Sequence, residues 1–223
     1  MPDSSKIVIA IDGPAGAGKS TVCRIVADRL GLRLLDTGAM YRCIALKAMR
    51  TGLEDIGSVE AMASVTQITF EPGDPQRVLL DGEDVTDEIR TLEVGEKASM
   101  ISSHPPVRVV LVAQQKALIA DGGCILEGRD TTTVVAPDAD VKIFLTASIE
   151  ERASRRHKEM AERGEKRRLQ EVVIDVIKRD YRDYTREGSP ITLAENAQII
   201  ETFDLTPEEV AKKIVDLAYR TDS

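Results

Sequence analysis

Residues 13–20 read Gly-Pro-Ala-Gly-Ala-Gly-Lys-Ser, which matches the pattern G-x-x-x-x-G-K-[ST] in full. An apolar run, Ile7–Ile11, comes shortly before this stretch, and a helical pattern over Thr21–Leu30 follows it. A buried strand, a glycine-rich turn and a helix N-terminus are the setting in which such a stretch binds phosphate. Glycines allow backbone N–H groups to approach phosphate oxygens where a Cβ would clash. The stretch therefore predicts a nucleoside triphosphate site.

We call residues 13–20 the glycine loop, and several of its positions have an expected role. Lys19 is expected to reach the β- and γ-phosphates, and Ser20 is expected to help hold Mg²⁺. The positive end of the following helix dipole faces the same anions. The residues predicted to bind the nucleotide and its metal here are Gly13, Pro14, Ala15, Gly16, Ala17, Gly18, Lys19, Ser20 and Thr21.

Composition limits the other functions of this chain. It has 223 residues, a formal net charge of −8, 3% aromatic residues and three cysteines that form no C-x-x-C pair. An acidic chain with few aromatic side chains offers little for nucleic-acid binding. An odd, unclustered set of cysteines is typical of a reducing compartment and argues against a disulfide framework or a zinc site. With no evident signal peptide and no apolar stretch of about 20 residues, we expect a cytoplasmic protein.

Strand and helix patterns alternate along most of the chain. The strand patterns cover residues 6–11, 32–35, 123–127, 140–146 and 197–200. The helix patterns cover residues 19–30, 38–50, 91–103, 148–163, 168–186 and 207–220. Alternation of this kind predicts an α/β fold in which a parallel sheet is flanked by helices.

Residues 52–105 interrupt this alternation. Val65–Phe70 and Arg77–Leu80 are predicted to be short strands, and Asp81-Gly82 is predicted to be a turn. We therefore expect an insert with a small antiparallel sheet. It separates the two parts of the core, residues 1–51 and 106–223.

Polar residues follow the predicted strand at 32–35. Asp36 and Thr37 come directly after it, and Arg42 lies on the next helix. Because open α/β sheets bind ligands at the carboxyl ends of their strands, these side chains are placed where a second substrate can lie beside the triphosphate. Two simpler interpretations stay open, since Asp36 can be a helix N-cap and Arg42 can form a surface salt bridge.

A third polar set follows the apolar strand that ends at Glu127. Glu127 stands where phosphate-binding loop proteins often place an acid that orients the magnesium shell. Arg129 can clamp phosphate through its planar guanidinium group, and Asp130 can accept a hydrogen bond from the exocyclic amine of a base. A turn with a single Arg–Asp pair is the alternative interpretation.

Arginines are frequent between residues 151 and 187, among many acidic residues. A solvated helical face with salt bridges accounts for most of them. Phosphoryl transfer between two nucleotides, however, needs several cations, because its catalysis is mostly positioning and charge neutralisation. The chain has no N-K-x-D motif and no D-x-x-G after Glu127, which disfavours a GTPase.

Five segments together resemble the bacterial cytidylate kinase family. They are Gly13–Ser20, Leu35–Arg42, Gly82–Thr91, Glu127–Ala139 and Arg179–Arg186. The resemblance covers essentially the whole chain, and D-T-G-A-M-Y-R and E-D-V-T-x-x-I-R are its specific parts. It implies a P-loop nucleoside-monophosphate-kinase-like core, a monophosphate-binding insert at 52–105 and a short helical lid at about 151–168.

The resemblance also implies an activity. This is the transfer of a phosphoryl group from ATP to CMP or dCMP, with Mg²⁺, by direct in-line displacement. The partners would be small nucleotides, with neither nucleic acid nor a membrane, and the protein would be a monomer. Another small-acceptor kinase (for UMP, AMP or shikimate) and a non-catalytic nucleotide switch remain as alternatives.

Site roles follow from the same resemblance. The cytosine-reading set is Thr37, Ser99, Arg108 and Asp130, and the sugar contacts are Arg179 and Asp183. The acceptor-phosphate clamp is Arg42, Arg129 and Arg186, with Asp36 also at the CMP site. The lid carries Arg152, Arg155 and Arg156, of which Arg156 contacts ATP. The catalytic residues are Lys19, Arg129, Arg155 and Arg186.

The chain departs from the family pattern directly after Asp130. Thr131-Thr132-Thr133 stands where the family usually has Ile-Gly-Thr, so that Thr132 replaces a glycine. We expect this change to affect the backbone path of the loop and the approach of Asp130 to the base.

Overall fold

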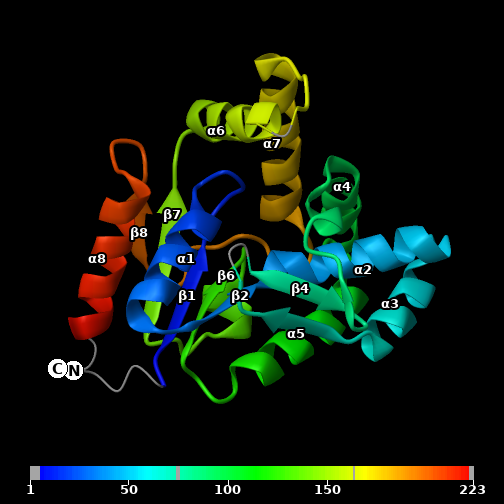
Figure 1. Cartoon of the computed structure of the whole chain (residues 1–223), viewed down its shortest axis with the longest axis horizontal. Helices are drawn as coiled ribbons and strands as arrows, with labels where there is room; N and C mark the ends of the chain where they lie inside the picture. The colour runs from blue at the N-terminus through cyan, green and yellow to red at the C-terminus, as the bar shows by residue number, and fades with distance from the viewer. Residues whose placement is uncertain (1–5, 74–75, 163, 221–223) are drawn as a thin grey trace. The chain divides into compact units, whose positions relative to one another are not determined.

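A computed structural model of the protein describes residues 6–73, 76–162 and 164–220 (Figure 1). The chain forms two compact units. Unit 1 comprises Met1–Leu34, Ile119–Thr185 and Ser189–Ser223, and unit 2 comprises Leu35–Leu118 and Arg186–Gly188. None of the helices among the described residues is both long enough and apolar enough to cross a membrane.

The main sheet has the strand order β2-β6-β1-β7-β8. Its strands are β2 (Arg33–Asp36), β6 (Cys124–Glu127), β1 (Val8–Asp12), β7 (Val141–Thr146) and β8 (Gln198–Glu201). The pairs β1–β6, β1–β7 and β7–β8 are parallel. With its flanking helices, this sheet confirms the predicted α/β fold class.

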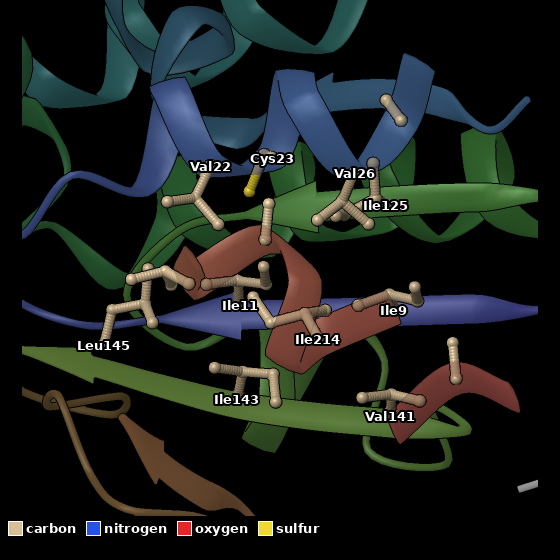
Figure 2. Close-up of a cluster of buried hydrophobic side chains, with 14 of the residues drawn as sticks. Ile9, Ile11, Val22, Cys23, Val26, Ile125, Val141, Ile143, Leu145 and Ile214 are labelled. Carbon is tan, nitrogen blue, oxygen red and sulfur yellow. The ribbon is translucent and has the colours of Figure 1, made fainter. Parts of the chain in front are cut away.

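Unit 1 places two helices on one face of this sheet. They are α1 (Lys19–Leu30) and α8 (Pro207–Arg220), which also pack against each other. Figure 2 shows the resulting core, in which Val22 and Val26 of α1 and Ile214 of α8 meet β-branched side chains from the strands. Such side chains pack well on a pleated surface that is buried on both sides. The core fixes β1 and α1 at the two ends of the glycine loop.

Local signals define the ends of these helices. Gly31 ends α1 with φ 66°, a left-handed conformation that glycine adopts without strain. A capping box begins α8, because Thr206 N donates to Glu209 Oε2 at 2.8 Å and Glu209 N donates to Thr206 Oγ1 at 3.2 Å. The remaining helices of unit 1 are α6 (Ile149–Glu162) and α7 (Leu169–Thr185), which pack together.

Unit 2 contains the small antiparallel sheet. Its strands are β3 (Ile68–Glu71), β4 (Arg77–Leu80) and β5 (Glu83–Asp84), in that order. Asp81 and Gly82 both have positive φ, 51° and 87°, as a two-residue hairpin turn of type I′ requires. The predicted antiparallel sheet and its Asp81-Gly82 turn are therefore confirmed.

The helices of unit 2 surround this sheet in the chain order. They are α2 (Thr37–Thr51), α3 (Ile56–Val65), the short 3-10 helix η1 (Glu88–Arg90), α4 (Leu92–Ile101) and α5 (Pro105–Ile119). Because α2 packs against α3 and α4, the compact unit extends beyond residues 52–105. The role of residues 52–105 as a monophosphate-binding insert remains a prediction.

The prediction of a strand from Val65 is wrong at its start. Residues 56–65 form α3, and the strand begins only at Ile68. The Asp55 carboxylate accepts a hydrogen bond from Ser58 N at 2.9 Å, and this cap begins the helix. The alternating pattern around residue 65 favoured a strand, but the buried face of α3 outweighs this local preference.

Candidate functional site

The glycine loop forms a tight turn between β1 and α1. Gly13, Gly16 and Gly18 have φ of 146°, 79° and 88°, which L side chains rarely adopt. A Cβ at Gly13 would lie 2.0 Å from the carbonyl oxygen of Leu145. No side chain caps the N-terminus of α1, where Gly18 is the N-cap residue. The loop is thus shaped by its backbone and presents a helix N-terminus of the kind that binds phosphate.

Lys19 is buried inside this loop. Its Nζ donates hydrogen bonds to the carbonyl oxygens of Gly13 and Pro14, both at 2.8 Å. Burial, followed by the nearby positive charge of Arg129, lowers the pKa of Lys19 to about 7. An anion that enters the loop therefore meets a lysine whose charged form it would stabilise.

Ser20 and Glu127 bring two oxygen groups together beside the loop. Ser20 Oγ donates to Glu127 Oε2 at 2.8 Å, and Glu127 is the last residue of β6. Magnesium prefers oxygen ligands and is commonly bound through few protein groups and substrate phosphates. The glycine backbone, the buried cation and this oxygen pair fit a nucleoside triphosphate with a divalent cation.

Arg152 on α6 lies in a buried network rather than on an exposed lid surface. Its guanidinium donates to both carboxylate oxygens of Asp180 at 3.1 and 2.7 Å and to the carbonyl oxygen of Ala15 at 3.1 Å. This bidentate pair joins α6 to α7 and to the glycine loop. Sequence reasoning missed Asp180, although its place directly after Arg179 in a quoted motif was a signal.

Arg155 lies beside the glycine loop from the next turn of α6. It donates to Thr202 Oγ1 at 2.9 Å and to the Thr202 carbonyl oxygen at 2.8 Å. A Cβ at Gly18 would lie 3.9 Å from Arg155 Nη1. Arg156, the neighbouring residue, is half-buried.

Three predicted site residues of unit 1 form one ionic cluster. Arg129 Nε donates to Asp183 Oδ2 at 2.9 Å, and Arg179 Nε lies 4.0 Å from the same oxygen. Burial opposes the charge of Arg129, but Asp183 outweighs this effect and raises the pKa of the guanidinium. Arg186, predicted to act beside them, is buried and belongs to unit 2.

The loop after Arg129 forms a single turn of π-helix, η2 (Thr131–Val135). The carbonyl oxygen of Asp130 accepts a hydrogen bond from Val134 N at 2.9 Å, while the Asp130 side chain makes no cap hydrogen bond to the turn. Single π-helical turns are rare and often occur at functional sites.

In unit 2, Asp36 has two partners. Its Oδ1 accepts from Ala39 N at 2.9 Å, which confirms the N-cap interpretation, and its Oδ2 accepts from Arg90 Nη2 at 2.9 Å. Burial alone would raise the pKa of Asp36, but Arg90 holds it below its usual range. Thr37 follows as the buried first residue of α2. Sequence reasoning missed Arg90 as a site residue, although it ends the specific E-D-V-T-x-x-I-R segment.

Arg42 extends from α2 to the start of α4. Its Nη1 donates to the carbonyl oxygen of Ile89 at 2.7 Å. A Cβ at Gly95 would lie 3.0 Å from the same nitrogen, so the absent side chain makes room for the guanidinium. The other interpretation of Arg42, a surface salt bridge, is not the contact that this geometry provides.

Ser99 on α4 and Arg108 on α5 are both buried in unit 2. The Arg108 guanidinium lies 5.5 Å from the centre of the Tyr41 ring, and its Nη1 donates to the Ser102 carbonyl oxygen at 3.0 Å. In the described part of the chain, Ser99 Oγ has no hydrogen-bond partner. A buried hydroxyl without a partner is costly, so this atom indicates a polar ligand.

Comparisons with known proteins give the family. A family model described as cytidylate kinase matches residues 9–220. A cytidylate kinase from Listeria innocua is 45% identical, over 96% of this chain and 97% of the relative. One from Geobacter sp. strain M21 is 49% identical, over 92% and 89%. These matches cover the two units and every segment described above.

Solved structures support the fold alone. An uncharacterised protein from Eubacterium ventriosum has a TM-score of 0.53 at 10% sequence identity, covering 96% of this chain and 99% of that chain. At this identity the likeness shows a shared architecture, whereas the sequence matches show shared descent over nearly the whole length. The chain belongs to the cytidylate kinase family.

Proposed function

We propose that this protein transfers the terminal phosphoryl group of ATP to CMP and dCMP in the presence of Mg²⁺. Family membership over residues 9–220 supports the reaction. The geometric observation that carries the acceptor half is the buried Ser99 hydroxyl without a partner among the described residues, in the same unit as the buried Arg108. Such a pair would hydrogen-bond a polar ring.

The donor half rests on unit 1. The backbone N–H groups of the glycine loop and Lys19 would hold the triphosphate. Ser20 would contact Mg²⁺, with Glu127 fixing the hydroxyl through the 2.8 Å hydrogen bond. The metal would neutralise charge on the phosphates. Arg155, whose guanidinium lies beside Gly18, would add a further positive charge on the same side.

The acceptor phosphate would be held by arginines. Arg42, Arg129 and Arg186 are proposed to clamp it, since a guanidinium group matches two phosphate oxygens at once. Asp183 holds Arg129 in one orientation through the 2.9 Å contact. Because the attacking oxygen of the acceptor is already anionic, these residues need only orient it and neutralise charge, and no strong general base is required.

Base recognition is proposed for Thr37, Ser99, Arg108 and Asp130. The Asp130 carboxylate would accept from the cytosine amino group, and Arg108 would donate to the ring nitrogen and carbonyl acceptors. Uracil carries a carbonyl where cytosine has the amino group, so it would leave the carboxylate unpaired. Sites that strand a buried polar group in this way discriminate strongly between substrates.

We also propose that the protein acts in the cytoplasm as a monomer on small nucleotides. The unclustered cysteines and the formal net charge of −8 support a reducing compartment and do not favour a nucleic-acid partner.

The test is ADP release by the purified protein from ATP–Mg²⁺, measured separately with CMP, dCMP, UMP, AMP and shikimate. The proposal predicts rapid ADP release with CMP and dCMP and slow release with the others. Faster release with another acceptor would replace the assigned substrate. ATP binding without ADP release from any acceptor would indicate a nucleotide switch.

A further inference from the structure

Asp12 is a buried carboxylate in the middle of unit 1. It is the last residue of β1, directly before Gly13, and its exposed fraction is 0%. A buried charge at this position must be satisfied by hydrogen bonds, because an isolated carboxylate would lose its hydration without compensation. Its partners therefore show what it does.

All four printed hydrogen bonds of this carboxylate come from one turn. Its Oδ1 accepts from Thr131 N at 2.8 Å and from Thr131 Oγ1 at 2.7 Å. Its Oδ2 accepts from Thr132 N at 2.8 Å and from Thr132 Oγ1 at 2.6 Å. A carboxylate has about four lone-pair sites, so Asp12 is saturated by these two residues.

The two hydroxyl donors are specific to this chain's departure from the family pattern. The usual Ile-Gly at these positions can offer the two backbone N–H groups but no hydroxyls. Both threonines are buried, with exposed fractions of 0% for Thr131 and 1% for Thr132. The replacement therefore doubles the donors that face Asp12.

The turn that Asp12 holds is the one that follows Arg129-Asp130. Asp130 accepts from Val134 N through its carbonyl oxygen at 2.9 Å, which makes it the first residue of the turn. On the other side, Asp183 holds Arg129 at 2.9 Å. The Arg129-Asp130 pair thus lies between two fixed points, Asp12 and Asp183.

We propose that Asp12 is a positioning residue for the acceptor nucleotide. Its carboxylate fixes the η2 turn, and through it the place of Arg129 and Asp130, on the same strand whose end begins the glycine loop. Asp12 acts through the turn and contacts neither nucleotide. This inference rests on the proposed function, since it assigns Arg129 and Asp130 to CMP.

A second role for Asp12 would be purely electrostatic. Its charge acts on Lys19 and on Arg129. Two variants separate the roles. Asp12→Asn removes the charge and half of the acceptor capacity, whereas a Thr131→Val/Thr132→Val variant keeps the charge and the backbone bonds and removes only the hydroxyls.

The experiment compares KM for CMP with KM for ATP in both variants. We expect the double threonine variant to raise KM for CMP about tenfold, because two charge-assisted hydrogen bonds are lost. KM for ATP should stay within about twofold of wild type, because the threonines do not touch the glycine loop. Asp12→Asn should raise KM for CMP further. Thr66→Val is the control, since the buried Thr66 hydroxyl donates to Met62 O at 2.7 Å in unit 2.

Amide hydrogen exchange of the ligand-free protein gives a readout that needs no activity. The N–H groups of Thr131 and Thr132 should exchange slowly in wild type and clearly faster in Asp12→Asn and in the double threonine variant. If Asp12→Asn does not fold, the threonine variant gives both answers. Wild-type protein that forms no CDP would refute the proposed function, while exchange would still test the clamp.

Two outcomes would overturn the inference. One is an unchanged KM for CMP in the double threonine variant. The other is an equal rise of KM for CMP and KM for ATP, which would assign Asp12 to electrostatics. Unchanged exchange at Thr131 and Thr132 in both variants would show that the carboxylate does not hold the turn.

Discussion

The glycine loop and the α4–α5 region (residues 92–119) present polar groups in opposite ways. In the glycine loop the backbone sets the shape, and Lys19 is satisfied by the loop's own carbonyl oxygens at 2.8 Å. In the α4–α5 region the side chains set the chemistry, and Ser99 Oγ has no partner in the described residues. The first region is complete without a ligand, and the second is left with an unmet hydrogen bond.

This difference implies a division of labour. A loop built from backbone N–H groups recognises phosphate, which every nucleotide carries. Buried side chains with fixed donors and acceptors recognise one base and reject another. Changes in the glycine loop should therefore reduce the rate with all acceptors, and changes in the α4–α5 region should alter the choice of acceptor.

The largest expected effect is on turnover. Lys19→Ala should lower kcat by about 10³-fold with every acceptor, because it removes the buried cation beside the triphosphate. Steady-state ADP release measures this. Lys212→Ala, an exposed lysine on α8, is the matched control. A Lys19→Ala rate near that of wild type would show that the loop does not act on the transferred group.

The next effect is on selectivity. Arg108→Ala should raise KM for CMP about 30-fold and reduce the preference for CMP over UMP, because a buried charged donor is lost. Arg77→Ala in the same unit removes only exposed ion pairs and serves as the control. Unchanged discrimination in Arg108→Ala would remove this residue from base recognition.

A smaller effect separates stability from binding. Gly95→Ala should preserve or raise the melting temperature, because alanine favours helix, yet raise KM for CMP about threefold by displacing the Arg42 guanidinium. The contact to relieve is the 3.0 Å approach of the new Cβ to Arg42 Nη1. Gly57→Ala in α3 is the control. Equal kinetics in the two variants would argue against a role for Arg42.

The smallest effect is a proton count. With its pKa near 7, Lys19 is mostly neutral at pH 7.5, and a bound triphosphate would raise that pKa. ATP–Mg²⁺ binding should therefore take up roughly half to one proton at this pH. Calorimetry in buffers of different ionisation enthalpy measures the uptake. Lys19→Arg keeps a cation that does not titrate, so binding without uptake is expected.

The sequence predicted what depends on neighbouring residues. The glycine loop, the ends of α1 and α8 and the Asp81-Gly82 turn all lie within a few residues of the groups that determine them. The pairs Arg90–Asp36 and Arg129–Asp183 are each separated by 54 residues, and Asp12–Thr131 by 119. Such pairs form only when the fold brings distant segments together, so Arg90 and Asp12 were missed.

The π-helical turn at η2 illustrates the same limit. Three consecutive threonines have no local preference for this rare geometry, which depends on the buried carboxylate of Asp12. The start of α3 was missed for a different reason. There the Asp55 cap and the buried helix face outweighed an alternating pattern typical of strands.

A competition assay tests the central claim most directly. CMP and UMP at equal concentrations, with limiting ATP–Mg²⁺, are offered in one tube to wild-type protein and to Arg108→Ala. We predict at least about tenfold more CDP than UDP from wild type, and a ratio that falls towards one in the variant while KM for ATP is unchanged. Equal amounts of CDP and UDP from wild type, or a ratio that Arg108→Ala does not alter, would contradict the account.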